Sequence, residues 1–231
     1  ASATAISMEA LLRWQHPELG MVSPADFIPV AEEGGQICDI GRWVLHSACR
    51  QAQRLITSGQ LTAGVSVNIS GPQIRRGDLH QTVTEALQAS GLPSHCLELE
   101  VTETFVMQQV EHSIDELYQL KKLGVRIAID DFGTGYSSLS QLKRLPIDRL
   151  KIDQSFVRNL PDDPEDRAIV KAIIALGTSL DLEVIAEGVE TEAQRQFLIN
   201  EGCGLGQGFL FYRPAPVNEL FATDDQAPGT A

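Results

Sequence analysis

The stretch Ala128-Ile-Asp-Asp-Phe-Gly-Thr-Gly-Tyr-Ser-Ser-Leu139 sets two adjacent carboxylates between an apolar run and a glycine-containing loop. Residues 125–129, which are apolar except for Arg126, are typical of a buried strand, and the serines after the loop are typical of a helix start. Neighbouring side chains on a strand point to opposite faces, so Asp130 and Asp131 can converge on one point only where the strand ends. Two like charges held together raise one pKa, whereas a divalent cation bound by their oxygens removes that cost. Taken alone, the pair fits equally well a strand end followed by a helix N-cap acid.

Length and composition place the chain among globular proteins. It has 231 residues, of which 43% are hydrophobic, so it can bury a sizeable core, and a single α/β barrel often reaches this length. The formal net charge of −13 argues against a nucleic-acid polymer or an anionic membrane surface as the main partner. Four scattered cysteines indicate reduced thiols, and no apolar run reaches the roughly 18 residues of a membrane span. We therefore expect a cytoplasmic domain without membrane contact of its own.

Strand and helix patterns alternate along the whole chain with short links between them, which predicts a parallel sheet. The expected strands are residues 5–9, 64–69, 97–101, 125–129, 149–152, 183–187 and 207–211. The expected helices are residues 24–33, 40–58, 79–90, 110–123, 137–143, 166–180 and 191–200. Seven strands are one short of a closed eight-stranded barrel, and an open doubly wound sheet is the alternative.

The two faces of the expected strands favour the barrel. Glu98 and Glu100 share one face of their strand, and Ser66 and Asn68 share one face of theirs, while leucines or valines occupy the opposite faces. A doubly wound sheet is covered by helices on both sides and would show nearly continuous apolar strands. One polar face instead fits the interior of a TIM-like (β/α)8 barrel, whose chemistry lies at the carboxyl ends of the strands.

Six of the expected strand ends carry an acid, an amide or a lysine. These residues are Glu9, Asn68, Glu100 with Glu103, Asp130 with Asp131, Lys151 with Asp153, and Glu187 with Glu190. A salt bridge at the barrel mouth explains any one of them. The whole set favours an oxygen-ligand site for two hard cations about 3.5–4 Å apart, an arrangement suited to phosphoryl transfer.

Two basic residues near these ends leave alternatives open. Lys151 could orient a water molecule or neutralise phosphate oxygens, or it could simply form an ion pair with Asp153. Arg13 could contact a phosphate or lie on a helix surface. None of the five histidines falls in a strand-end motif, and no Ser-His-Asp pattern is present. A metal-dependent sugar-processing or aldolase-type barrel is a weaker alternative.

The ordered series of motifs resembles the EAL domain family, bacterial phosphodiesterases that cleave cyclic di-GMP. The motifs are Glu9-Ala-Leu11, Leu12-Arg-Trp14, Val67-Asn-Ile-Ser70, Glu100-Val-Thr-Glu103, Asp130-Asp-Phe-Gly-Thr-Gly-Tyr-Ser-Ser138, Lys151-Ile-Asp153, Glu187-Gly-Val-Glu190 and Gln207-Gly-Phe209. The resemblance implies that residues 1–222 form a domain that hydrolyses the substrate to linear pGpG. The polar, proline- and glycine-containing composition of residues 223–231 predicts a disordered tail. The resemblance also implies a TIM-like barrel with an antiparallel first strand, and we expect that strand to be missing from this chain.

The resemblance further implies a role for each matching residue. The implied ligands of two Mg²⁺ or Mn²⁺ ions are Glu9, Asn68, Glu100, Asp130, Asp131 and Glu187. Lys151 would steady the attacking water, and Glu187 would act as the general base or as the partner of that base on the metal side. These two are the implied catalytic residues. The implied substrate contacts are Arg13, Gln207 and Asp153. The implied loop-stabilising residues are Glu103, Glu190, Phe132, Gly133, Thr134 and Gly135.

The family also sets expectations for partners. We expect cyclic di-GMP as substrate, a homodimer, and upstream sensory or GGDEF-type cyclase domains in the full-length protein. The location would be the bacterial cytoplasm, either free or as the cytoplasmic part of a membrane-anchored protein. A domain that binds cyclic di-GMP without turnover, as a receptor, is the alternative function.

Overall fold

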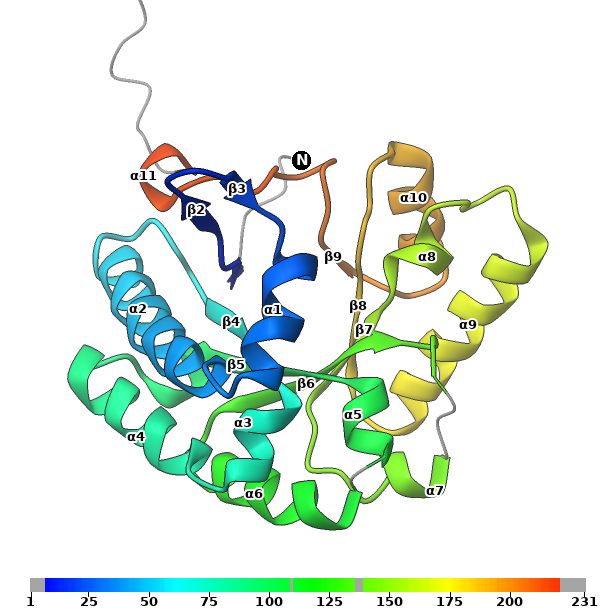
Figure 1. Ribbon diagram of the computed structural model, residues 1–231. Coiled ribbons are helices and arrows are strands. Elements are labelled where there is room, and N and C mark those ends of the chain that lie inside the picture. The colour runs from blue at the N-terminus through cyan, green and yellow to red at the C-terminus, as the bar shows by residue number, and fades with distance from the viewer. Residues whose placement is uncertain (1–6, 109, 136–138, 221–231) are drawn as a thin grey trace, which may run out of the picture.

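Seven parallel strands form one curled sheet in which each strand pairs with the next along the chain (Figure 1). The computed structural model describes residues 7–108, 110–135 and 139–220. The strands are β1 (Ser7–Ala10), β4 (Gly64–Asn68), β5 (Leu97–Thr102), β6 (Arg126–Phe132), β7 (Arg149–Ile152), β8 (Glu183–Ala186) and β9 (Leu205–Gly206). Within these ranges, β1 and β9 do not pair with each other, so the curled sheet keeps a seam between its first and last strands. The predicted TIM-like parallel architecture is confirmed.

Helices cover the outside of the sheet. They are α1 (Pro24–Glu33), α2 (Ile37–Thr57), α3 (Gly71–Arg76), α4 (Leu79–Ser90), α5 (Glu103–Gln108), α6 (Val110–Lys122), α7 (Leu139–Leu142), α8 (Gln154–Val157), α9 (Pro164–Ser179), α10 (Glu192–Asn200) and α11 (Val217–Leu220). Figure 1 shows α2 and α4 outside the curled sheet on its left and α9 and α10 outside it on its right. None of the described helices is both long and apolar enough to span a membrane.

Local sequence explains where the main helices begin and end. Asp163 caps α9 by accepting hydrogen bonds from two backbone N–H groups of its first turn, and Pro164 suits the first helical position. Thr191 and Gln194 form a capping box at the start of α10. Gly91 ends α4 in the left-handed conformation that closes many helices.

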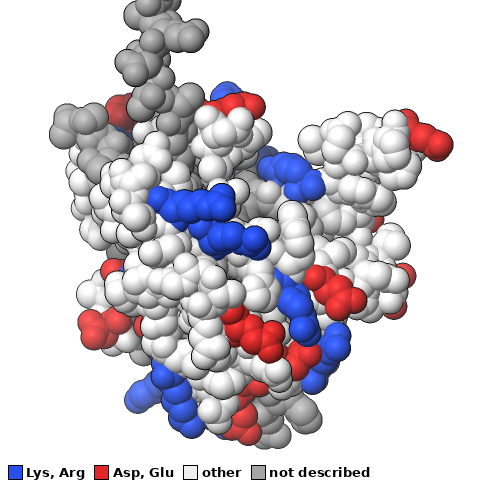
Figure 2. Space-filling view, turned by 90° about the vertical axis from the view of Figure 1, so that its left-hand side faces the viewer, with Lys and Arg blue, Asp and Glu red and all other residues white. Residues whose placement is uncertain are grey.

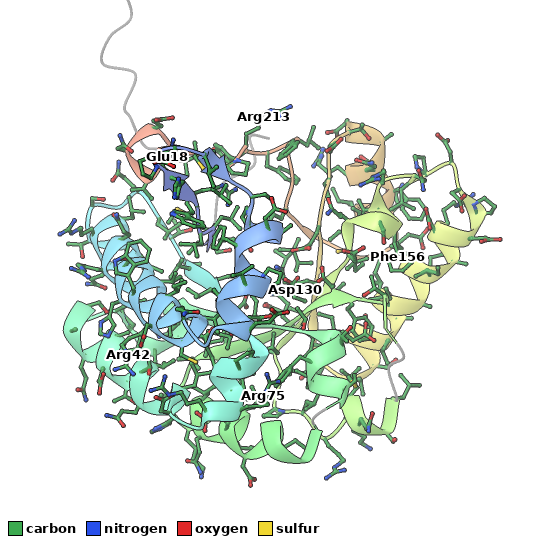
Figure 3. All side chains as sticks on the ribbon, viewed as in Figure 1. Glu18, Arg42, Arg75, Asp130, Phe156 and Arg213 are labelled. Carbon is green, nitrogen blue, oxygen red and sulfur yellow. The ribbon has the colours of Figure 1, made fainter. Side chains whose placement is uncertain are left out.

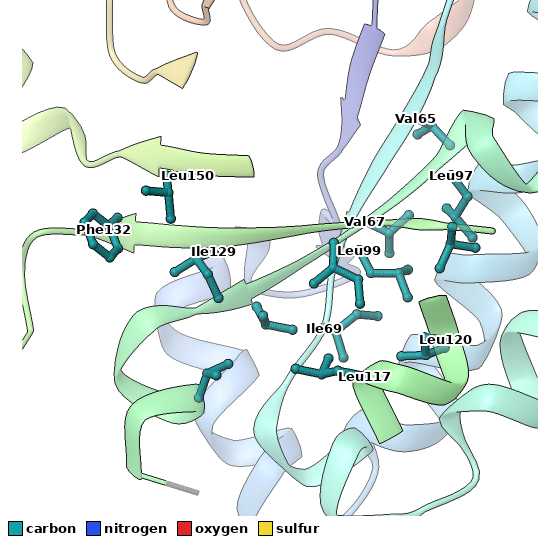
Figure 4. Close-up of a cluster of buried hydrophobic side chains, with 14 of the residues drawn as sticks. Val65, Val67, Ile69, Leu97, Leu99, Leu117, Leu120, Ile129, Phe132 and Leu150 are labelled. Atoms are coloured by element: carbon teal, nitrogen blue, oxygen red, sulfur yellow. The ribbon is translucent and has the colours of Figure 1, made fainter. Parts of the chain in front are cut away.

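The apolar core lies between the outward faces of the strands and these helices. Figure 4 shows Val67 of β4, Leu99 of β5 and Ile129 of β6 beside Leu117 and Leu120 of α6, and all five are buried. Burying an aliphatic side chain of this size stabilises the fold by about 1.5–3 kcal/mol. Because the apolar faces point outward, the polar residues that alternate with them line the barrel interior, as the sequence predicted.

The structure corrects several predicted elements. The last strand is Leu205–Gly206, not 207–211, because the chain turns after Gly208, where Phe211 and Tyr212 donate to its carbonyl. The antiparallel hairpin of β2 (Trp14–His16) and β3 (Gly20–Val22) was missed, as were the short helices α3, α5 and α8. Residues 137 and 138 of the predicted helix 137–143 lie outside the described residues, and so does the predicted disordered tail at 223–231.

Candidate metal centre

A bulge at the end of β6 brings the two adjacent aspartates to one point. The register between β6 and β7 shifts between Ile129 and Phe132, and Asp131 has a φ of 54°, in the left-handed region. The carbonyl of Asp131 accepts hydrogen bonds from the Thr134 hydroxyl at 2.9 Å and backbone N–H at 3.4 Å, which hold this turn. The reversal of the backbone at Asp131 therefore cancels the alternation of strand side chains that would otherwise separate the two carboxylates.

Three carboxylates meet at the mouth of the barrel. Asp130, Asp131 and Glu187 each offer one oxygen, and these oxygens all lie within 4.8 Å of one another. Figure 3 shows Asp130 near the centre of the barrel, behind α1. Carboxylates packed this closely repel one another, and a hard divalent cation that prefers oxygen ligands offsets that repulsion. These oxygen ligands therefore fit a hard divalent cation.

A buried lysine lies among the same carboxylates. The Lys151 side chain is 2% exposed, and its Nζ lies 2.7 Å from Glu100, 3.0 Å from Asp130 and 2.6 Å from Glu187. Burial alone would lower the pKa of Lys151, but the surrounding carboxylates outweigh it and raise that pKa above its usual value. The side chain is thus held charged, and its partners are these three acids rather than Asp153.

The single positive charge of Lys151 does not neutralise the negative charges of the acids around it. Burial, together with the charges of Glu9 and Asp130, raises the pKa of Glu100 to about 8 in spite of Lys151. Burial and the Asp130 charge likewise raise the pKa of Glu187 to about 7. Burial and the charges of Asp130 and Asp153 raise the pKa of Asp131 to about 6. Without a metal ion, the cluster therefore takes up protons near neutral pH.

Two side-chain amides hold Glu9, one from the neighbouring strand β4 and one from across the seam of the sheet. Asn68 Nδ2 donates to Glu9 Oε1 at 2.6 Å, and Gln207 Nε2 donates to Glu9 Oε2 at 2.6 Å. Asn68 ends β4, whereas Gln207 directly follows β9, so the contact with Gln207 joins the first and last strands. Because Nδ2 of Asn68 points toward Glu9, the side-chain carbonyl oxygen of Asn68 stays available as a ligand atom for a cation. In this structure Gln207 contacts Glu9, one of the predicted metal ligands, and its predicted role as a substrate contact stays a prediction.

The predicted loop-stabilising glutamates differ in their surroundings. Glu103 is buried, and its Oε2 accepts hydrogen bonds from the backbone N–H groups of Gly133 at 2.7 Å and Gly135 at 3.4 Å. Glu190 is exposed at the start of α10, where its backbone N–H donates to Gln194. Its side chain makes no hydrogen bond or ion pair with loop residues 132–135, the part of the loop that the structure describes. These contacts support the loop role of Glu103, and the loop role of Glu190 stays a prediction.

Asp153 lies beside the cluster rather than on Lys151. Its carboxylate accepts hydrogen bonds from the backbone N–H and the hydroxyl of Ser155 and thereby caps α8. Its negative charge also helps to raise the pKa of Asp131. Its predicted role as a substrate contact stays a prediction.

Arg13 lines a cavity of about 680 Å³ between the β2–β3 hairpin, α1 and α2. Trp14, Trp43 and Phe27 supply aromatic walls, and Asp39 supplies a carboxylate. Trp14 and Trp43 remain 43% and 61% exposed, unusually open for tryptophan, which indicates a surface suited to a ligand. Sequence reasoning missed these tryptophans, although Trp14 directly follows Arg13.

The fold and the site define the class of protein. It is a parallel α/β barrel with a buried lysine and clustered carboxylates at the carboxyl ends of its strands. The EAL domain family model matches residues 1–214, and the chain belongs to this family.

Curated relatives and solved structures agree with that assignment. The bifunctional diguanylate cyclase/cyclic di-GMP phosphodiesterase MucR of Pseudomonas aeruginosa is 49% identical over 94% of this chain and 32% of its own length. The cyclic di-GMP phosphodiesterase NbdA of the same organism is 46% identical over 92% of this chain and 27% of its own. The chain thus spans a third or less of the length of these relatives.

Two solved structures extend the comparison. The PaMucR phosphodiesterase in complex with c-di-GMP matches with a TM-score of 0.88 and 49% identity, covering 92% of this chain and 86% of that one. The FimX EAL domain of Pseudomonas aeruginosa bound to c-di-GMP matches with a TM-score of 0.82 and 27% identity, covering 93% and 86%.

Proposed function

We propose that this domain is a metal-dependent phosphodiesterase that hydrolyses cyclic di-GMP to linear pGpG. The observation that carries the proposal is the group of Asp130, Asp131 and Glu187, with Lys151 held charged beside it. The names of MucR and NbdA, both called cyclic di-GMP phosphodiesterases, support the same chemistry and substrate.

The proposed metal ligands divide between two ions. Glu9, Asn68, Glu100 and Asp130 would hold one Mg²⁺ or Mn²⁺, and Asp130, Asp131 and Glu187 would hold the second. Bound ions of this kind polarise a phosphate and acidify a water molecule, so that attack and departure of oxygen both become easier. Glu9 is already oriented by two amides, and Asp131 by its turn, so these ligands need little rearrangement.

The remaining steps belong to the protein's own side chains. Glu187 is proposed to accept the proton of the attacking water, because its carboxylate lies within 4.8 Å of the Asp130 and Asp131 oxygens that would hold an ion. Lys151 supplies a fixed positive charge on the floor of the site and holds Glu100, Asp130 and Glu187 in place through its three short contacts. Fixing reacting groups in this way removes part of the entropic barrier to reaction.

The cavity beside Arg13 is proposed to take one guanine of the substrate. Its aromatic walls can stack on a purine, and the carboxylates of Asp26 and Asp39 can accept hydrogen bonds from a guanine amino group. Arg13 stands four residues after Glu9, at most about 14 Å along an extended chain, so it can reach a phosphate of a substrate bound at the metal site.

The partners of the full-length protein are also proposals. We propose a homodimer, with sensory or GGDEF-type domains upstream in a bacterial cytoplasmic protein. The name of MucR, which includes a diguanylate cyclase, supports such an arrangement. On the face shown in Figure 2, acidic residues lie among the basic ones, which does not favour a nucleic-acid polymer.

The test is to incubate the chain with cyclic di-GMP, with Mn²⁺ or with a chelator, and to separate the products by chromatography. Metal-dependent pGpG is the expected result. Binding of cyclic di-GMP without product, measured by calorimetry under the same conditions, would replace the enzyme by a receptor. If the chain neither binds cyclic di-GMP nor forms product, both functions are rejected.

A further inference from the structure

The helical turn after β7 contacts the ligand-bearing loop that follows β6. The Phe156 ring of α8 lies directly against Gly133: a Cβ built on Gly133 would come within 2.8 Å of Phe156 Cε2. Gly133 has a φ of 104° and its N–H is held by Glu103. Because Gly133 is two residues after Asp131, the ring limits how far the Asp131 turn can move. Figure 3 shows Phe156 on α8, to one side of Asp130.

The same turn contacts the loop that follows β8. A Cβ built on Gly188 would lie 2.6 Å from the Cβ of Gln154, and Gly188 has a φ of 67°. Gly188 directly follows Glu187, the carboxylate from the other side of the cluster. The first and third residues of α8 therefore pack against two glycines, each close in sequence to a carboxylate of the metal centre.

The turn is itself anchored at both ends. Asp153 caps its first residues, and the Gln194 side chain, which is buried, donates to the carbonyl of Arg158 at 3.0 Å. The same Gln194 accepts from the backbone N–H groups of Glu190 and Thr191, which follow Glu187 in the chain. A rigid segment thus stands between the two loops.

We infer that α8 is a positioning element that sets the separation of Asp131 and Glu187, with Phe156 and Gln154 as its two contact residues. Neither side chain is a metal ligand or touches the reacting atoms. The inference rests on the proposed metal site, and it adds that the site's affinity for metal depends on the packing of α8 against Gly133 and Gly188. Residues that orient ligands in this way typically change metal affinity when they are replaced.

The first test compares Mn²⁺ binding by Phe156→Ala and the wild-type chain, without substrate, by electron paramagnetic resonance of free Mn²⁺. We expect the dissociation constant to rise roughly 10–100-fold, the range found when groups that orient metal ligands are removed. Phe156→Leu, which keeps an apolar contact, should recover most of the affinity. The matched control is Phe197→Ala: Phe197 is another half-buried aromatic packed on the core, but it lies on α10 beside Arg167 and Lys171. Its loss should leave Mn²⁺ binding unchanged.

A second pair of variants separates contact from backbone strain, and it decides the matter if Phe156→Ala does not fold. Gly188→Ala adds a methyl group against Gln154, whereas Gly91→Ala places one at a similar positive φ with nothing within 4 Å. We expect only Gly188→Ala to weaken Mn²⁺ binding. Gln154→Gly in the Gly188→Ala background removes the opposing Cβ and should restore binding in part.

The outcomes distinguish this inference from the proposed function. If the wild-type chain binds no Mn²⁺, the proposed metal site is wrong. If the wild type binds Mn²⁺ and Phe156→Ala and Gly188→Ala bind it equally well, the positioning role alone is wrong. An equal loss of affinity in Phe197→Ala or Gly91→Ala would also overturn the positioning role.

Discussion

Replacing Lys151 with methionine removes the positive charge that lies among Glu100, Asp130 and Glu187 while keeping a side chain of similar length. Lys151 is 2% exposed and lies within 3.0 Å of three acids, so the variant leaves buried carboxylates uncompensated. Breaking a buried ion pair from one side costs roughly 3–5 kcal/mol. We expect a loss of that size in the free energy of unfolding of the metal-free protein near pH 8.

The loss should shrink as the pH falls. Glu100 and Glu187 have folded pKa values raised to about 8 and about 7, above their unfolded values of 4.5. A carboxyl with a raised folded pKa contributes stability that is full below its unfolded pKa and is lost as the pH rises through the folded pKa. Without Lys151 these values rise further, so near pH 5 the acids are protonated and the missing charge matters least.

The assay is urea unfolding followed by circular dichroism in a chelator, at both pH values. Lys171→Met is the matched control, because Lys171 pairs with Glu201 at the surface, where its side chain is 46% exposed. Such exposed pairs contribute about 0–1 kcal/mol. A loss for Lys151→Met that is no larger than the control, or that does not change between the two pH values, would refute the reasoning.

Two further predictions address the ligands and the loop. Asp130→Asn, which keeps the shape but removes a charge facing Lys151, should abolish Mn²⁺-dependent turnover and the thermal stabilisation by Mn²⁺; retained stabilisation, measured by scanning fluorimetry, would contradict the ligand assignment. Glu103→Gln should lower turnover roughly 10–100-fold, the range for groups that orient ligands, because it weakens the hold on Gly133 and Gly135, whereas Glu190→Gln should leave turnover unchanged. Equal rates for both variants in the same chromatographic assay would contradict the difference that the structure assigns to them.

The repeating architecture was predictable because it rests on local patterns. Helices 24–33 and 79–90 were predicted with the bounds that the structure shows, since each has a proline or a glycine at an end and a continuous apolar face. The alternation of Ser66 and Asn68 with valines correctly assigned the inner and outer faces of β4. The prediction of a strand at 207–211 was wrong because the apolar residues there lie in a turn. The backbone N–H of Val189 donates to the carbonyl of Gln207, and the backbone N–H of Leu210 donates to the carbonyl of Val189, so the chain curves away from the sheet.

The candidate site was predictable as a set of residues but not as a set of contacts. A parallel sheet places the carboxyl ends of its strands at one edge, so the polar residues there were expected to meet. The partners of Lys151 do not follow from that placement, because they depend on three other strands and on the curvature of the sheet. Nor does the sequence Asp130-Asp131 disclose that its second residue adopts a left-handed conformation. Phe156 was not predicted as a functional residue, because its role depends on a contact with Gly133 in a different loop.

Gln207 gives the sharpest contrast between the two kinds of reasoning. As a substrate contact, its loss would raise KM and leave the free protein unaffected. In the structure it donates to Glu9 across the seam, 198 residues away, so it stabilises the protein without substrate. A hydrogen bond to a charged group contributes about 1.5–3 kcal/mol. We therefore expect Gln207→Leu to lose stability of that order in metal-free urea unfolding, whereas Gln196→Leu, at an exposed position on α10, should change it by no more than about 0.5 kcal/mol. Unchanged stability with a raised KM would instead support the substrate contact that the sequence predicted, and the hydrogen bond between Gln207 and Glu9 would then contribute little to the stability of the seam.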